Sequence, residues 1–236
     1  MACEALVKLE YNGSIIANLL ATPVDFYELM IGHLVCEGFM PTNPVHVEHS
    51  FNVEESSRSY HCSMLSQMEI DLASASNRVI TSSCGACNSD DLEQLISDLP
   101  IVEKDTSTIN FNSLNKCFNS MRERQLGFQL TGGMHAAGIT DSTNDLLFVL
   151  EDIGRHNAVD KVIGKALTSN INLSETTLLL SGRCGWDIVA KASRCGIANI
   201  VSIGACSSLA AKAARYTGVR IISFLKHDNA VIIGQN

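Results

Sequence analysis

The sequence predicts an α/β protein with two parts, a smaller N-terminal α+β domain and a larger C-terminal α/β domain. From residue 131 onward, short apolar strands alternate with amphipathic helices, as in βαβ units that form a largely parallel sheet covered on both faces. The first part instead has a hairpin pattern around one helix. We place the domains at residues 1–80 and 111–236, and residues 81–110 hold a C-x-x-C loop and a connecting helix.

The N-terminal part has the signals of a ββαββ unit. Residues 6–10 alternate apolar and polar side chains, Asn12-Gly13 is a turn signal, and residues 15–20 supply the second strand of a hairpin. Thr22-Pro23 predicts an N-cap followed by proline at the first helical position, and the helix runs to Gly38. Two further strands are expected at residues 45–53 and 59–70.

The C-terminal part has the longer series of elements. After the C-x-x-C loop we expect helices at residues 89–99 and 112–127. The strands that follow are expected at residues 146–150, 177–180, 200–203 and 220–224, and the helices between and after them at residues 157–168, 186–195 and 207–217.

Composition restricts the function. The chain has 236 residues and a formal net charge of -8, which argues against a large basic surface for nucleic acid. It has no apolar run long enough to span a membrane, and its first residues lack the features of a signal peptide. Nine cysteines, most of them in apolar surroundings, are typical of a reducing compartment. We therefore expect a cytoplasmic protein with neither nucleic acid nor membrane as a partner.

Polar residues follow each strand of the second part. Ligands of open α/β sheets bind outside the carboxyl ends of the strands, where glycines allow close approach and helix N-termini attract anions. Arg155 and Arg183 could bind phosphate there in a bidentate way. Together these features indicate an anionic, nucleotide-like ligand, although no G-x-G-x-x-G motif or P-loop is present. The candidate contacts are Gly132, Gly133, His135, Arg155, His156 and Arg183.

Cys84 and Cys87 form the C-x-x-C pair, which could bind a soft metal, cycle as a disulfide or carry sulfur. A structural zinc needs four ligands, and no second C-x-x-C or H-x-x-H pair accompanies these two. A thioredoxin-like dithiol normally opens a helix directly after a strand, whereas this pair lies between the two domains. Nucleophilic sulfur chemistry is favoured, with Arg155, His156 or Arg183 supplying the charge that activates a thiolate.

Several segments resemble, in the same order, the formate dehydrogenase accessory sulfurtransferases, the FdhD family. The resemblance covers nearly the whole chain, and the segment from Glu151 to Lys161 is its most specific part. The matching segments are Ala21-Thr-Pro-Val-Asp25, Gly32-His-Leu-Val-Cys-Glu-Gly38, Thr81-Ser-Ser-Cys84-Gly-Ala-Cys87, Thr131-Gly-Gly-Met-His-Ala-Ala137, Glu151-Asp-Ile-Gly-Arg-His-Asn-Ala-Val-Asp-Lys161, Ser181-Gly-Arg183 and Ser207-Ser-Leu-Ala210.

This resemblance implies a cytidine-deaminase-like C-terminal domain and a sulfurtransferase that forms a homodimer. Such a protein accepts sulfur from a cysteine desulfurase as a persulfide and passes it to the molybdenum cofactor, bis-molybdopterin guanine dinucleotide, for formate dehydrogenase. Cys84 matches the persulfide carrier, and Cys87 matches its companion. The cofactor-binding stretch near the C-terminus corresponds to Phe224, Leu225, Lys226, His227, Asp228 and Asn229.

Three other interpretations are weighed against this one. A non-enzymatic chaperone could bind the molybdenum cofactor and formate dehydrogenase without transferring sulfur, and a zinc-binding C-x-x-C protein is a weaker alternative. A zinc deaminase would need H-x-E followed by P-C-x-x-C, and the chain lacks this order of motifs.

Cys184, next to Arg183, is either a third thiol at the sheet edge or a small residue in the first turn of a helix.

Overall fold

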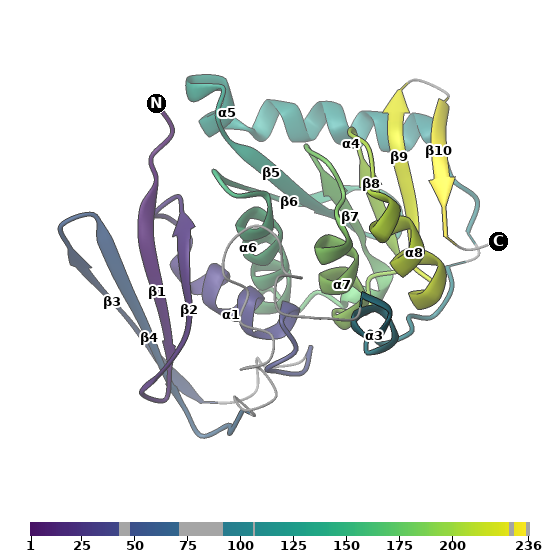
Figure 1. Ribbon diagram of the computed structural model, residues 1–236. Helices are drawn as coiled ribbons and strands as arrows, with labels where there is room; N and C mark the ends of the chain where they lie inside the picture. Colours follow the sequence, from purple (N-terminus) through teal and green to yellow (C-terminus); the bar gives the residue numbers. More distant parts are fainter. Residues whose placement is uncertain (43–47, 71–91, 106, 227–228, 235–236) are drawn as a thin grey trace.

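The computed structural model describes residues 1–42, 48–70, 92–105, 107–226 and 229–234 (Figure 1). Two sheets lie side by side with helices between and around them, so the mixed α/β class is confirmed. The predicted domain boundaries at residues 80 and 111 stay a prediction, and so does the cytidine-deaminase-like description. Within the described ranges, no helix is both long and apolar enough to cross a membrane.

The N-terminal sheet has four strands in the order β2-β1-β4-β3. Its first hairpin is confirmed: β1 and β2 pair antiparallel, and Asn12 and Gly13 both have positive φ in the turn between them. β3 and β4 form a second antiparallel hairpin, and β4 lies parallel to β1. The strands are β1 (Ala5–Tyr11), β2 (Ser14–Ala21), β3 (His49–Ser56) and β4 (Ser59–Ser66).

Helix α1 (Phe26–Cys36) starts later than Thr22-Pro23 predicts. The prediction of Thr22 as the N-cap is wrong, because Thr22 forms hydrogen bonds with residues 152 and 153 of the C-terminal part instead. α1 packs closely on helix α6 (Arg155–Thr168). A Cβ at Gly32 would overlap the backbone carbonyl of Asp160, and one at Gly164 would overlap that of Glu28. These glycines let the two helix backbones meet.

The C-terminal sheet has six strands in the order β10-β9-β8-β7-β5-β6. β7, β8 and β9 are parallel, as predicted, but β5 runs antiparallel to both of its neighbours and β10 runs antiparallel to β9. The largely parallel prediction is therefore wrong for β5 and β10, because the connections from β5 to β6 and from β9 to β10 are too short for a crossover helix. The strands are β5 (His135–Thr140), β6 (Leu146–Asp152), β7 (Thr177–Leu180), β8 (Asn199–Ser202), β9 (Arg220–Lys226) and β10 (Asn229–Ile233).

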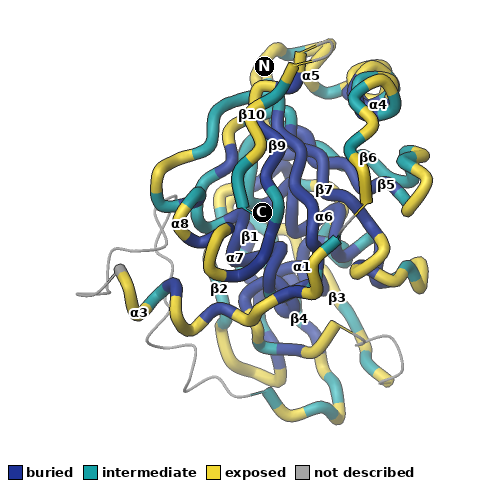
Figure 2. Tube along the Cα trace, turned by 90° about the vertical axis from the view of Figure 1, so that its right-hand side faces the viewer, coloured by how far each residue is buried: buried dark blue, intermediate teal, exposed yellow. Residues whose placement is uncertain are grey.

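Helices cover both faces of this sheet (Figure 1). α4 packs Leu114, Phe118 and Met121 against one face, whereas α6, α7 and α8 lie on the other with α1. Figure 2 shows the central strands buried between these layers. The helix predicted at residues 112–127 is instead two helices that meet at Gln125. The remaining helices are α3 (Leu92–Ser97), α4 (Phe111–Arg124), α5 (Leu126–Thr131), α7 (Trp186–Arg194) and α8 (Ser208–Thr217).

Candidate functional site

One edge of the C-terminal sheet collects most of the predicted ligand contacts. β6, β7, β8 and β9 all end at this edge, and β5 begins there because it runs in the opposite direction. The register places His135 opposite Asp152, and Leu180 opposite Ser202. We call this the ligand edge, and define it as residues 132–135, 151–156, 181–187, 203–208 and 224–226. Its geometry suits a ligand that lies across several strand ends.

Three helices begin at the ligand edge. α6 starts after Gly154, α7 after Gly185 and α8 after Ser207. Ser207, where the sequence predicts a helix to begin, is the N-cap of α8, and its Oγ accepts a hydrogen bond of 3.1 Å from the backbone N–H of Ala210. α6 begins at Arg155 rather than at the predicted Asn157. Three positive helix ends at one edge favour the binding of an anion.

Arg155, Arg183 and His135 lie near one another at this edge. A Cβ at Gly182 would lie 3.1 Å from His135 Nδ1. Burial lowers the pKa of His135, and the positive charges of Arg155 and Arg183 lower it further. Neither guanidinium forms an ion pair with a carboxylate in the part of the chain that the structure describes. The two arginines can therefore offer their positive charge to a ligand.

His156, unlike its neighbour Arg155, has a carboxylate partner in the described part of the chain. Its Nε2 is in contact with Asp187 Oδ2, and this contact joins the first turns of α6 and α7. Burial lowers the pKa of His156, Asp187 raises it and Arg155 lowers it, and the net direction is downward. Asp187 was not among the residues predicted from the sequence. Asp187 lies two residues after Gly185, and this spacing belongs to no familiar motif that could have identified it.

Much of the segment from Glu151 to Lys161 has a structural task that the sequence did not reveal. Asp152 Oδ2 accepts a hydrogen bond of 2.9 Å from the backbone N–H of Thr22 and pairs with Lys161 Nζ at 2.7 Å. Asp152 Oδ1 accepts from Gly154 N at 2.8 Å and from Asn157 Nδ2 at 3.0 Å. These bonds fix the end of β2 against the ligand edge. The i, i+4 spacing of Asn157 and Lys161 was the one available signal.

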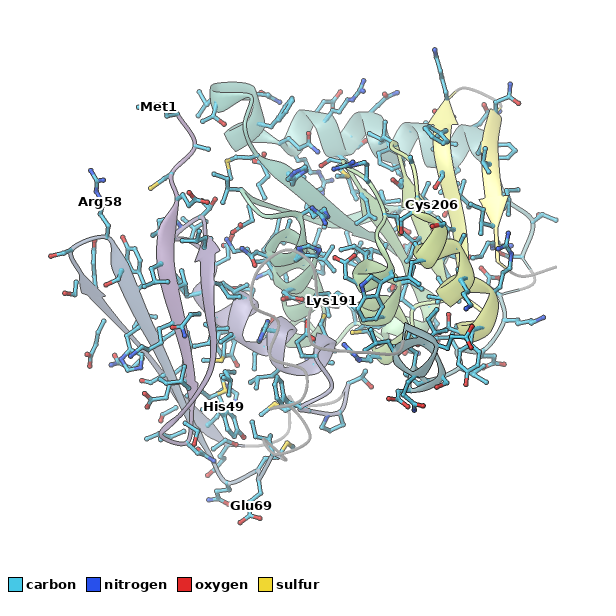
Figure 3. All side chains as sticks on the ribbon, in the orientation of Figure 1. Met1, His49, Arg58, Glu69, Lys191 and Cys206 are labelled. Carbon is cyan, nitrogen blue, oxygen red and sulfur yellow. The ribbon has the colours of Figure 1, made fainter. Side chains whose placement is uncertain are left out.

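A second buried charge cluster lies deeper between α1, α6 and α7, around Lys191 (Figure 3). Lys191 Nζ contacts Glu37 at 2.5 Å and Asp160 at 2.7 Å. Burial alone would raise the pKa of Asp160, but Lys191 and His33 lower it to about 2. Asp160 and Glu37 in turn raise the pKa of Lys191 against the effect of burial. The cluster joins the N-terminal helix to the α/β part and leaves no charge unpaired.

The predicted cofactor stretch reaches the ligand edge in part. Phe224 has a positive φ of 55°, and its backbone N–H donates to the carbonyl of Gly204 at 3.3 Å. Phe224 and Lys226 are exposed, and Leu225 is buried. Asn229 begins β10. His227 and Asp228 lie outside the described residues.

The glycines before β5 have separate tasks. Gly132 has a φ of 68° and ends α5, a conformation that favours glycine. A Cβ at Gly133 would meet only Ala2, at 3.7 Å. The two glycines connect the end of α5 to His135, the first residue of β5 at the ligand edge.

Cys184 lies at the ligand edge as a buried residue. Its backbone forms an isolated parallel β-bridge with that of Cys206, and both thiols are free. The backbone N–H of Cys184 donates to the carbonyl of Ala205 at 3.0 Å. Burial raises the pKa of the Cys184 thiol far above its ordinary value, so the thiol stays protonated. These facts favour a small packing residue over a third reactive thiol. Cys184 precedes the cap of α7 rather than lying in its first turn.

Cys84 and Cys87 lie outside the described residues, and the structure does not place them relative to the ligand edge. Across the described ranges, no three His, Cys, Asp and Glu side chains gather in a way that could hold a metal ion. The predicted role of Cys84 and Cys87 stays a prediction, and the zinc alternative for this pair stays open.

Comparisons with known proteins give a consistent result. A sequence model of the FdhD/NarQ family matches residues 2–235. The sulfur carrier protein FdhD of Picrophilus torridus is 34% identical over 92% of this chain and 80% of its own length. The protein of the same name from Mycobacterium tuberculosis is 32% identical over 97% of this chain and 87% of its own length. A crystal structure described as a formate dehydrogenase accessory protein from Desulfotalea psychrophila shares the fold, with a TM-score of 0.74 and 19% identity over 99% of this chain and 87% of that one.

Proposed function

The chain belongs to the FdhD/NarQ family, and from this premise we propose that it is a sulfur carrier in the maturation of a formate dehydrogenase. The names of the curated relatives support the sulfur carrier role. The description of the structural neighbour supports the connection with formate dehydrogenase.

In this proposal Cys84 carries the sulfur. A persulfide on a cysteine desulfurase gives its outer sulfur to the Cys84 thiol, which becomes a persulfide while the desulfurase regains its thiol. Cys87 is the companion thiol, three residues away. The small and polar residues around both cysteines suit a loop that presents a reactive thiol to two partners. The chain therefore acts as a sulfurtransferase with a persulfide intermediate.

The destination of the sulfur is the molybdenum cofactor, bis-molybdopterin guanine dinucleotide, as a bound substrate. It carries phosphates, and the ligand edge has the features that phosphates need. The observation that supports this most is that Arg155 and Arg183 lie beside three helix N-termini without a carboxylate partner in the described ranges. Phe224 and Lys226, exposed at the same edge, are the residues we expect to meet the nucleotide end.

Mass spectrometry of the intact chain tests the sulfur carrier role. After incubation with a cysteine desulfurase and cysteine, we expect an adduct of about 32 Da, the mass of one sulfur atom. The adduct should be absent in Cys84→Ala and present in Cys3→Ala, because Cys3 is an exposed thiol far along the sequence from the C-x-x-C loop. A wild-type chain that gains no mass contradicts the proposal. Stoichiometric zinc in the purified chain would favour the metal-binding alternative.

Complementation separates a sulfur carrier from a chaperone. In cells that lack their own protein of this kind, the wild-type chain should restore formate dehydrogenase activity and Cys84→Ala should not. Restoration by Cys84→Ala would mean that binding of the cofactor is enough and that sulfur transfer is not needed. The same cells can report the expected cytoplasmic location, and light scattering of the purified chain can test the homodimer that the family resemblance implies.

A further inference from the structure

The His156–Asp187 pair links the N-termini of two helices at the ligand edge. His156 is the second residue of α6 and Asp187 the second of α7, and their side chains are 23% and 18% exposed. The carboxylate meets Nε2 of the imidazole. No hydrogen bond of Nδ1 to another described residue is present, so this atom remains for a ligand or solvent. The contact with Asp187 thus occupies Nε2 and leaves Nδ1 as the nitrogen that can meet a ligand.

The chain has a glycine where this arrangement needs one. A Cβ at Gly185 would overlap Oδ1 of Asp187. Only glycine therefore lets the carboxylate fold back over the start of α7 toward α6 without a shift.

Four charged groups act on His156. From α7, Asp187 raises its pKa and Lys191 lowers it, and from α6, Asp160 raises it and Arg155 lowers it. Burial is the largest influence, and it favours the neutral ring. An anion at the ligand edge would add negative charge close to this ring. Such a charge favours the protonated form of histidine.

We propose that Asp187 is a positioning residue for His156, which it holds at Nε2 so that the ring takes up a proton when a phosphate-bearing ligand enters the ligand edge. This inference rests on the proposed function, because it assumes that a nucleotide with phosphates binds there. The neutral ring keeps its proton on Nε2, where Asp187 accepts it, and the incoming proton from solvent binds Nδ1. The imidazolium then faces the ligand with one nitrogen and Asp187 with the other. No covalent bond of the ligand changes.

The ligand-free chain tests the hold of Asp187 on His156. Histidine resonances of the full chain are followed through a pH titration by ¹⁵N NMR, with His156 assigned from His156→Gln. Asp187→Asn should lower the pKa of His156 by about one unit, as expected for loss of a neighbouring opposite charge. In Asp187→Glu, which keeps the negative charge, the pKa of His156 should return most of the way to its wild-type value. The control is Glu93→Gln, which removes an exposed carboxylate paired with Lys212. A His156 titration that Asp187→Asn leaves unchanged overturns the inference.

Calorimetry tests the link between ligand and proton, with GDP and inorganic pyrophosphate as probes. Binding heats in two buffers with different ionisation enthalpies give the number of protons taken up. We expect the wild-type chain to take up a proton when it binds GDP. Asp187→Asn should not take up this proton, and its affinity for GDP should be about tenfold lower. Glu93→Gln should behave like the wild type. Equal proton uptake by the wild type and Asp187→Asn overturns the role of Asp187. Binding of pyrophosphate with proton uptake, but not of GDP, supports that role and contradicts the nucleotide destination. No uptake with either probe overturns the inference.

Discussion

Lys161 and Asp152 form an ion pair that is buried completely, with 2.7 Å between Nζ and Oδ2. The same lysine donates to the backbone carbonyl of Thr22 at 2.9 Å, while the aspartate accepts the backbone N–H of Thr22 at 2.9 Å. One residue of the N-terminal part is thus bonded from both sides by a pair from the C-terminal part. Asp152 ends β6 at the ligand edge, so the shape of this edge depends on the pair.

Removal of the cation from this pair should be costly. Lys161→Met leaves the Asp152 carboxylate buried without its partner, and we expect the free energy of unfolding to fall by about 3 to 5 kcal/mol. Chemical denaturation measures the change. Lys212→Met is the matched control, because it breaks an exposed ion pair with Glu93 and should change stability far less. Equal losses in the two variants would contradict the structural role of Lys161.

The contact between α1 and α6 should be sensitive to a single methyl group. A Cβ at Gly32 would overlap the carbonyl of Asp160, so Gly32→Ala must move one helix away from the other. We expect a loss of about 1 to 3 kcal/mol in the free energy of unfolding. Gly133→Ala is the control for stability, since its Cβ would meet only Ala2 at 3.7 Å. A Gly32→Ala chain as stable as the wild type would show that the two helices are not in close contact.

The Lys191 cluster predicts a loss of stability in acid. Interactions in the cluster hold the pKa of Asp160 at about 2, below its ordinary value of 3.8. A carboxylate with a lowered pKa stabilises the fold fully above its unfolded pKa, and this contribution is lost as the pH falls through its folded pKa. We expect a loss on the order of 2 kcal/mol between about pH 4 and pH 2. Asp160→Asn should be less stable at pH 7 and show a shallower decline over this interval. An unchanged slope would contradict the assignment.

The arginines of the ligand edge should contribute to binding rather than to stability. Arg183→Gln removes an exposed guanidinium, and we expect GDP affinity to fall by about tenfold or more with an unchanged unfolding midpoint. Calorimetry and thermal unfolding measure the two quantities. Arg215→Gln removes an exposed arginine from the last turn of α8, away from the ligand edge, and should leave both unchanged. If both variants lose the same affinity, the effect is only that of net charge.

Part of this architecture could be predicted because its signals are local. The first hairpin follows from Asn12-Gly13, and α8 follows from the amphipathic pattern of residues 207–217. The Thr22-Pro23 signal failed because Thr22 forms tertiary hydrogen bonds, which local pattern cannot show. The direction of β5 was not visible either, since strand periodicity is the same in both directions.

The site could be predicted only in outline. Arg155 and Arg183 lie at one edge because β6 and β7 both run antiparallel to β5 between them and therefore end at the same edge. The neighbouring Asp152 and Lys161 look equally polar in the sequence but are fully buried. Sequence alone cannot separate a charge that binds a ligand from one that meets another charge in the core. Asp187 was missed for the same reason, because its partner His156 is distant in the sequence.

Discharge of the loaded carrier tests the central claim most directly, because it involves both the sulfur and the ligand edge. The chain is loaded by a cysteine desulfurase with ³⁴S-labelled cysteine, purified, mixed with the molybdenum cofactor and weighed intact over time. We predict that the wild type loses its labelled sulfur to the cofactor, whereas Arg155→Gln/Arg183→Gln accepts the label but keeps it. Equally fast discharge of the wild type and the double variant would contradict delivery of sulfur at the ligand edge.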